Sequence, residues 1–200
     1  LQACGCCITG QTERMVPADR KLYALRDVTG TVPSIPLIVA SILCKKLAAG
    51  LDGLVLDVKC GSGAFMPLPA DARALLGALV NTGRQLGLRL DALISDMNQP
   101  LGRAVGNALE VREALEVLRG GGPADLLELT LELGARMLLL GRLAADRDAA
   151  LALLREKLRS GAALDRFQTM VRLQGGDVRA LEQPELLPTA PIREPQLAER

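Results

Sequence analysis

Ser41 and Lys45 lie four residues apart in the apolar run IPLIVASILCKK, a spacing that places two side chains on one face of a helix. A hydroxyl and an ammonium are costly to bury on such a helix unless a polar group meets them. Arg26 stands just upstream in LYALRD, so the stretch offers a hydroxyl and two cations that can stabilise negative charge on a ligand. In the alternative interpretation, Lys45 and Lys46 only complement the helix dipole from its last turn, and spacing alone favours that role.

The element that positions Ser41 and Lys45 is predicted to be a helix over residues 35–49. Ser34 is a plausible cap, Pro36 is tolerated in a first turn, and Gly50 ends the helix. The run is apolar on nearly every side, which indicates a helix covered by other elements. A shorter helix from Pro17 to Leu25 precedes it, and Tyr23 and Arg26 share a face if that helix continues.

After this helix, the spacing of apolar residues along the sequence changes. LVLDVKC, residues 54–60, is typical of a buried parallel strand, residues 71–86 form an amphipathic helix, and residues 88–95 form a second strand. Strand, helix and strand at this length make a βαβ unit. We therefore predict an α/β fold with a mixed or parallel sheet flanked by helices. A small helical lobe, residues 18–49, is inserted between residues 1–17 and 50–200 of the α/β domain.

The rest of the chain predicts one further strand, several helices and a glycine turn. Residues 4–9 are predicted to form a short buried strand, and helices are predicted over residues 107–118, 124–140, 146–160 and 163–173. Asn107 and Glu110 resemble a capping arrangement. The glycine turn GSGAF follows the first strand of the βαβ unit, where open α/β sheets bind ligands, but a simple tight turn is equally compatible with it.

Composition excludes several classes of function. The chain has 200 residues, a formal net charge of +1 and 2% aromatic residues, which argues against nucleic-acid binding. It contains no histidine, so a Ser-His-Asp triad, a Cys-His pair and a histidine metal site are excluded within it. The five cysteines lack zinc-site spacing and suit reduced thiols. We expect no metal, no membrane span and a cytoplasmic location.

The stretch LYALRDVTGTVPSIPLIVASILCKKLAAGLDGLVLDVKCGSGAFM, followed by DMNQPLGRAVGNALEVREAL, closely resembles the pyrimidine nucleoside phosphorylases, the family that includes thymidine phosphorylase. The similarity extends from about Gly5 to Leu187. It implies a pentosyltransferase that cleaves thymidine or deoxyuridine with phosphate, giving the free base and 2-deoxy-D-ribose 1-phosphate. Such an enzyme would belong to nucleotide salvage.

The resemblance also implies roles for individual residues. Arg26, Ser41 and Lys45 would contact the pyrimidine, with Arg26 and Lys45 as the catalytic cations, and Tyr23 and Phe65 would line the base pocket. A departing pyrimidine gains negative charge on N1, O2 and O4, and fixed cations stabilise that charge most in the transition state. Phosphate is then a co-substrate, and no cofactor is required.

Family members are longer than this chain, which implies that it is a central segment lying between a phosphate-binding amino-terminal part and the rest of the α/β domain. An alternative is therefore a catalytically incompetent fragment that retains only the base-binding half of the site. A phosphoribosyltransferase of related architecture is a weaker alternative, because its pyrophosphate-binding and magnesium-binding acidic motifs are not found. The resemblance further implies a homodimer formed through the helical lobe. Thymidine and uridine preference stays undecided.

Overall fold

The computed structural model describes residues 1–10, 12 and 14–197. Residues 11, 13 and 198–200, which fall within the predicted first and last parts of the α/β domain, lie outside the described residues. The elements in chain order are α1 Pro17–Val28, α2 Ile35–Ala48, β1 Leu54–Cys60, α3 Pro69–Gln85, β2 Leu90–Asp96, α4 Asn107–Leu118, α5 Ala124–Leu140, α6 Arg147–Arg159, α7 Ala162–Leu173, α8 Arg179–Glu182 and a 3-10 turn at Pro184–Leu186. None of the described helices is long and apolar enough to cross a membrane.

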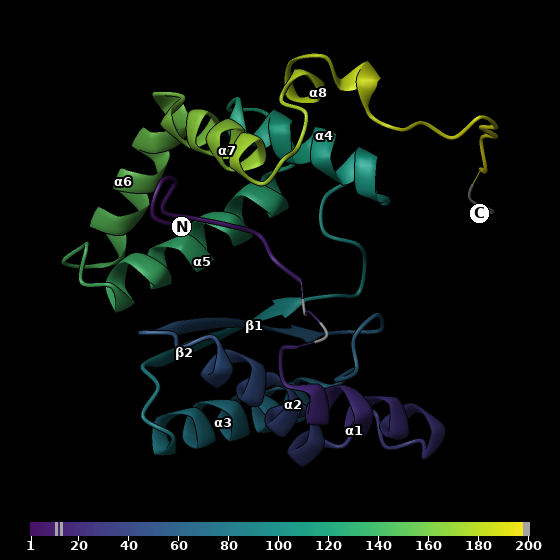
Figure 1. Ribbon diagram of the computed structural model, residues 1–200, viewed down its shortest axis with the longest axis vertical. Coiled ribbons are helices and arrows are strands. Elements are labelled where there is room, and N and C mark those ends of the chain that lie inside the picture. The colour runs from purple at the N-terminus through teal and green to yellow at the C-terminus, as the bar shows by residue number, and fades with distance from the viewer. Residues whose placement is uncertain (11, 13, 198–200) are drawn as a thin grey trace.

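The sheet separates two groups of helices (Figure 1). β1 and β2 pair in parallel, with Leu54 opposite Leu90 and Cys60 opposite Asp96. Helices α1, α2 and α3 lie on one side of the sheet, whereas α4 to α8 lie on the other, and α5 packs against both strands. This arrangement confirms the predicted α/β class with a parallel sheet flanked by helices.

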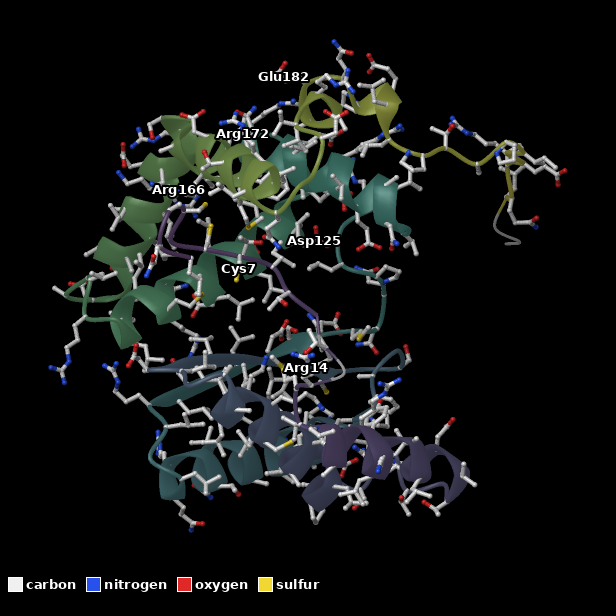
Figure 2. All side chains as sticks on the ribbon, viewed as in Figure 1. Cys7, Arg14, Asp125, Arg166, Arg172 and Glu182 are labelled. Carbon is white, nitrogen blue, oxygen red and sulfur yellow. The ribbon has the colours of Figure 1, made fainter. Side chains whose placement is uncertain are left out.

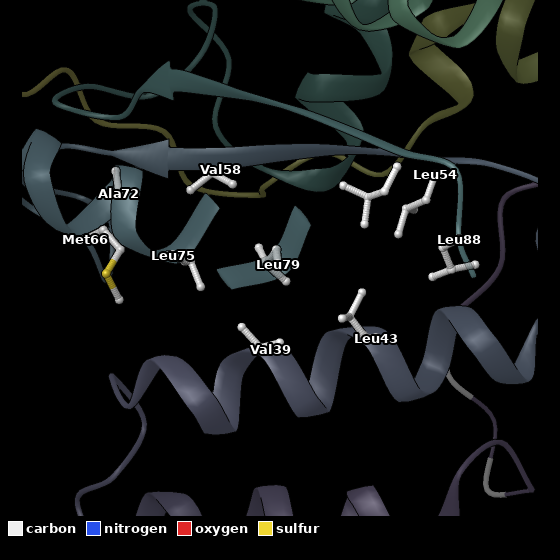
Figure 3. Packing of buried hydrophobic residues seen from close by; sticks show 10 residues of the cluster. Val39, Leu43, Leu54, Val58, Met66, Ala72, Leu75, Leu79 and Leu88 are labelled. Atoms are coloured by element: carbon white, nitrogen blue, oxygen red, sulfur yellow. The ribbon is translucent and has the colours of Figure 1, made fainter. Parts of the chain in front are cut away.

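The main core lies between β1, α3 and α2 (Figure 3). Val39 and Leu43 of α2 point toward Leu79 of α3 and toward Leu54 and Val58 of β1. Leu43 and Leu79 are at most 2% exposed. A fully buried leucine contributes roughly 1.5–3 kcal/mol, so this interface anchors α2 firmly to the sheet.

Most predicted elements are confirmed to within a few residues. The strand at residues 54–60 has the predicted bounds, as do the helices at residues 107–118 and 124–140. Helix α1 continues to Val28, three residues beyond its predicted end, and therefore includes Arg26. The domain boundaries at 17 and 49 stay a prediction, and α2 shares its core with β1 and α3.

The predicted strand over residues 4–9 is wrong. Its first part is a turn, in which the Gly5 amide donates to the Leu1 carbonyl at 2.6 Å. Ile8 is 70% exposed and exchanges two hydrogen bonds with the side-chain amide of Gln174, at 3.1 and 2.7 Å. An apolar run becomes a strand only when another strand satisfies its backbone, and here the Gln174 side chain bonds the backbone of Ile8 instead.

The amino-terminal segment is also held by α7 (Figure 2). Arg166 of α7 donates to the Cys4 carbonyl at 2.9 Å, and the Cys4 thiol donates to the Arg166 carbonyl at 3.7 Å. Cys4 is buried, as predicted, although it is not in a strand. All five cysteines are free thiols.

The glycine turn after β1 packs against the chain that leaves β2. The Gly63 amide donates to the Met97 carbonyl at 2.9 Å, and the Ser62 amide donates to the Asn98 side chain at 3.1 Å. Gly61 has φ +139°, and a Cβ added there would lie 2.6 Å from the Asn98 amide nitrogen. The backbone amides of the turn are therefore hydrogen-bonded within the chain, which favours the structural role over a ligand site.

Two glycine substitutions should have opposite effects on stability. Gly61→Ala should lower the free energy of unfolding by about 1–3 kcal/mol, because its Cβ meets backbone that cannot move independently. Gly77→Ala lies in α3, where a Cβ has nothing within 4 Å, and should raise it by about 0.5–1 kcal/mol. Urea unfolding followed by circular dichroism measures both. Equal effects of the same sign would contradict the packing described here.

Candidate functional site

The polar residues predicted for the site converge where α1 faces α2. Asp19, Tyr23 and Arg26 follow the spacing i, i+4, i+7 and therefore lie on one face of α1. Ser41 and Lys45 meet them from α2. We did not predict Asp19 as part of the site, although its helical spacing from Tyr23 and Arg26 could have indicated it.

Lys45 is hydrogen-bonded to both Asp19 and Ser41. The Lys45 ammonium donates to Asp19 Oδ2 at 2.5 Å and to Ser41 Oγ at 2.9 Å. Asp19 and Ser41 are both buried, so the polar groups that the apolar α2 carries into the interior are met by a carboxylate. The alternative role of Lys45 as only a dipole partner does not account for these contacts.

Burial and hydrogen bonding act on the Asp19 carboxyl in opposite directions. Burial raises its pKa, but hydrogen bonds from Lys45 and Ser41 outweigh that effect, and the pKa lies below its ordinary value of 3.8. Asp19 is therefore ionised at neutral pH. Beside it, burial and the Asp19 charge raise the pKa of the Cys44 thiol.

Arg26 is held by backbone carbonyls that precede and begin α2. It is 6% exposed, its Nη2 donates to the Val32 carbonyl, and its Nη1 donates to the Leu37 carbonyl at 3.5 Å. Within the described residues its buried Nε has no hydrogen-bond partner. A buried guanidinium N–H without a partner is costly, and a ligand acceptor would remove that cost.

A small cavity lies beside these groups. It measures about 220 Å³, and its walls are mostly apolar, with Asp19, Arg26 and Ser41 as the buried polar members. Its other walls come from Leu22, Leu25, Thr29, Thr31, Leu37 and Ala40. An apolar cavity with a few converging polar groups has the character of a small-molecule site.

Tyr23 connects the two cations at the rim. Its ring centroid lies 5.1 Å from the Arg26 guanidinium carbon and 5.9 Å from Lys45 Nζ. Both distances suit cation–π attraction. The ring is about half exposed, so it borders the site without closing it.

Phe65 does not join this cluster. It is 65% exposed and lines a separate cavity of about 210 Å³, together with residues of α2, β1 and α3. Four of the five predicted site residues, Tyr23, Arg26, Ser41 and Lys45, therefore lie together, and Phe65 lies apart. The resemblance placed Phe65 near the base by its motif, whereas the turn that carries it packs on Met97.

Carboxylates occupy the second glycine-rich loop, after β2. Buried Glu113 accepts from the Arg103 and Ala104 amides at 2.8 and 3.1 Å, and Asp125 accepts from Gly102 at 3.0 Å. Glu110 accepts from the Gly106 amide at 3.0 Å, which is the capping role predicted for it, although Gly106 rather than Asn107 is the cap residue. Among the described residues, no three His, Cys, Asp or Glu side chains converge as metal ligands.

The stability contribution of Asp19 should depend on pH. Its pKa is lower in the folded state, so the ionised carboxylate stabilises the fold above its ordinary titration range, and this contribution is lost as the pH falls through the folded pKa. Asp19→Asn should lower the free energy of unfolding by about 1.5–3 kcal/mol at pH 7. The difference from the unaltered chain should shrink below about pH 4.

Urea unfolding at several pH values measures this difference. The control is the same substitution in a Lys45→Met background, where the carboxylate has lost its cation and Asp19→Asn should cost much less. A pH-independent difference, or equal costs in the two backgrounds, would contradict the ion pair as its source.

Comparison with known proteins agrees with the resemblance carried by the Leu22 to Met66 stretch. Pyrimidine-nucleoside phosphorylases of Staphylococcus aureus strains USA300, NCTC 8325 / PS 47 and bovine RF122 / ET3-1 are each 56% identical to the chain over 183 residues. The match covers 92% of this chain and 42% of each relative. Residues 1–164 match the family described as Glycosyl transferase family, a/b domain. The chain therefore belongs to this glycosyl transferase family, and its matched residues are part of the a/b domain.

Proposed function

We propose that this chain carries the base-binding part of a pyrimidine-nucleoside phosphorylase. The observation that carries the proposal is that Arg26 and Ser41 line a mostly apolar cavity of about 220 Å³, and that Lys45 donates a hydrogen bond to Ser41 at 2.9 Å. The identity of 56% to proteins named pyrimidine-nucleoside phosphorylase supports the same function.

The proposed reaction transfers a pentose from a pyrimidine to phosphate. A phosphate oxygen forms a bond to C1′ of the sugar, and the bond between C1′ and N1 of the pyrimidine breaks. The bonding electrons leave with the base and spread over N1, O2 and O4 before water supplies a proton. Groups that stabilise this developing anion lower the barrier more than they stabilise bound substrate.

The described side chains suit that anion. Arg26 has a buried Nε without a partner among the described residues, which can donate to a ring oxygen or nitrogen. Lys45 supplies an ammonium, and the Ser41 hydroxyl beside it can donate or accept at the ring edge. In a site with apolar walls these charges act more strongly than they would in water.

Finer features of the proposal rest on the family. We assign thymidine and deoxyuridine as substrates, 2-deoxy-D-ribose 1-phosphate as the product, phosphate as co-substrate and no further cofactor. A cytoplasmic role in nucleoside salvage agrees with the five free thiols. A homodimer through the helical lobe is supported by exposed apolar side chains of α1 and α2, namely Leu22, Leu25, Val28 and Leu37.

A second candidate is base binding without phosphorolysis. It is favoured by one observation, that the chain spans 42% of the length of the relatives it matches. The two candidates share the base site and differ in whether phosphate releases the base.

The chain contains one tyrosine and no tryptophan, so its ultraviolet-excited emission reports on Tyr23 alone. Thymine or uracil that binds near Arg26 and Lys45 should change this emission, after correction with N-acetyltyrosinamide for light absorbed by the base. Lys45→Met should raise the Kd by about tenfold or more, because a hydrogen bond to a charged group is lost. Release of thymine from thymidine, where phosphate supports it, should fall by about 10²–10³.

The matched control is Lys46→Met, which removes an exposed lysine from the same helical turn. It should leave binding unchanged. Phosphate-dependent release of thymine by the unaltered chain would exclude the second candidate, whereas binding without release would exclude phosphorolysis by this chain. Absence of any response to thymine or uracil would overturn both.

A further inference from the structure

We propose that Asp19 is a positioning residue of the base site, which orients the Lys45 ammonium and sets the charge that the departing pyrimidine meets. This inference rests on the proposed function and deepens it, because it assigns a task to a carboxylate that does not itself contact the base.

Two hydrogen-bond partners fix the direction of the Lys45 ammonium. A lysine ammonium has three N–H donors on a flexible stem and takes up many directions unless partners hold it. In the described part of the chain, two of these donors are directed to Asp19 and Ser41, at 2.5 and 2.9 Å. The Asp19 residue is 8% exposed, so its carboxylate cannot turn away into solvent. The third N–H is thereby aimed before a ligand arrives, which saves the entropy of ordering it.

Asp19 also sets the net charge of the site. Arg26 and Lys45 both lie within 6 Å of the Tyr23 ring centroid, and two cations beside the same ring repel each other. The Asp19 carboxylate at 2.5 Å from Lys45 Nζ cancels one of them. The three groups together carry one net positive charge, which matches a pyrimidine leaving as a monoanion. Without the carboxylate, the site would favour a more highly charged anion.

An ordinary structural role for Asp19 can be separated from this one. An acidic residue in the first turn of a helix also interacts favourably with the helix dipole. Helices α1 and α3 both open with Pro-Ala-Asp, so Asp71 holds in α3 the position that Asp19 holds in α1. Asp71 is exposed, whereas Asp19 is buried against Lys45. Asp71→Asn is therefore a matched control for the dipole effect.

The test compares the unaltered full chain with Asp19→Asn, Asp19→Glu and Asp71→Asn. Thymine and uracil are titrated against Tyr23 emission, and urea unfolding gives the folded fraction of each variant. Asp19→Asn should raise the Kd of the folded protein by about tenfold or more, Asp19→Glu should recover part of the loss, and Asp71→Asn should change nothing. An unchanged Kd for folded Asp19→Asn would overturn the inference.

A measurement on the unaltered chain keeps the inference testable if Asp19→Asn does not fold. With ¹⁵N-labelled lysine, the Lys45 ammonium should give a slowly exchanging NMR signal, assigned by its loss in Lys45→Met, that moves when thymine is added. A rapidly exchanging Lys45 ammonium would overturn the inference. If the unaltered chain binds neither base, the proposed function fails; if it binds and Asp19 variants bind equally well, only the positioning role fails.

Discussion

A carboxylate and an ammonium that meet at 2.5 Å between α1 and α2 are the contact on which the site depends. Neither Asp19 nor Ser41 is accessible enough for water to satisfy it, so each needs the others as partners. This contact also links α1 to α2. Arg26 of α1 contacts α2 separately, through the carbonyls of Val32, just before α2, and Leu37, in its first turn.

The other face of α2 connects this arrangement to the sheet. Val39 and Leu43 lie two residues before Ser41 and Lys45 respectively, which is about 200° around a helix, so they face the opposite way. They pack against β1 and α3, whereas the polar pair faces α1. This double contact explains why α2 is apolar on nearly every side. The position of Lys45 therefore depends on how Val39 and Leu43 pack in the core.

Three carboxylates near the loop after β2 bind backbone amides. Glu113, Asp125 and Glu110 together take four amides of the loop after β2, and the amides of the turn after β1 are used by Met97 and Asn98. Loop amides that have no sheet or helix partner must be satisfied in this way. Among the described residues, the buried side-chain donors without a partner are Arg26 Nε, between α1 and α2, and Arg112 Nε of α4.

The sequence by itself determined the elements with local signals and the identity of most site residues. The period of LVLDVKC, the proline and glycine that bound α2, and the four-residue spacing of Ser41 and Lys45 are all local, and they predicted β1, α2 and one half of the polar cluster. Only the tertiary structure decided what meets that half. Asp19 is 26 residues from Lys45, and although helical spacing places it on the same face as Tyr23 and Arg26, no local rule brings that face against Lys45. The same limit explains residues 4–9 and Phe65, because the pairing of a strand and the cavity that a side chain lines both depend on distant parts of the chain.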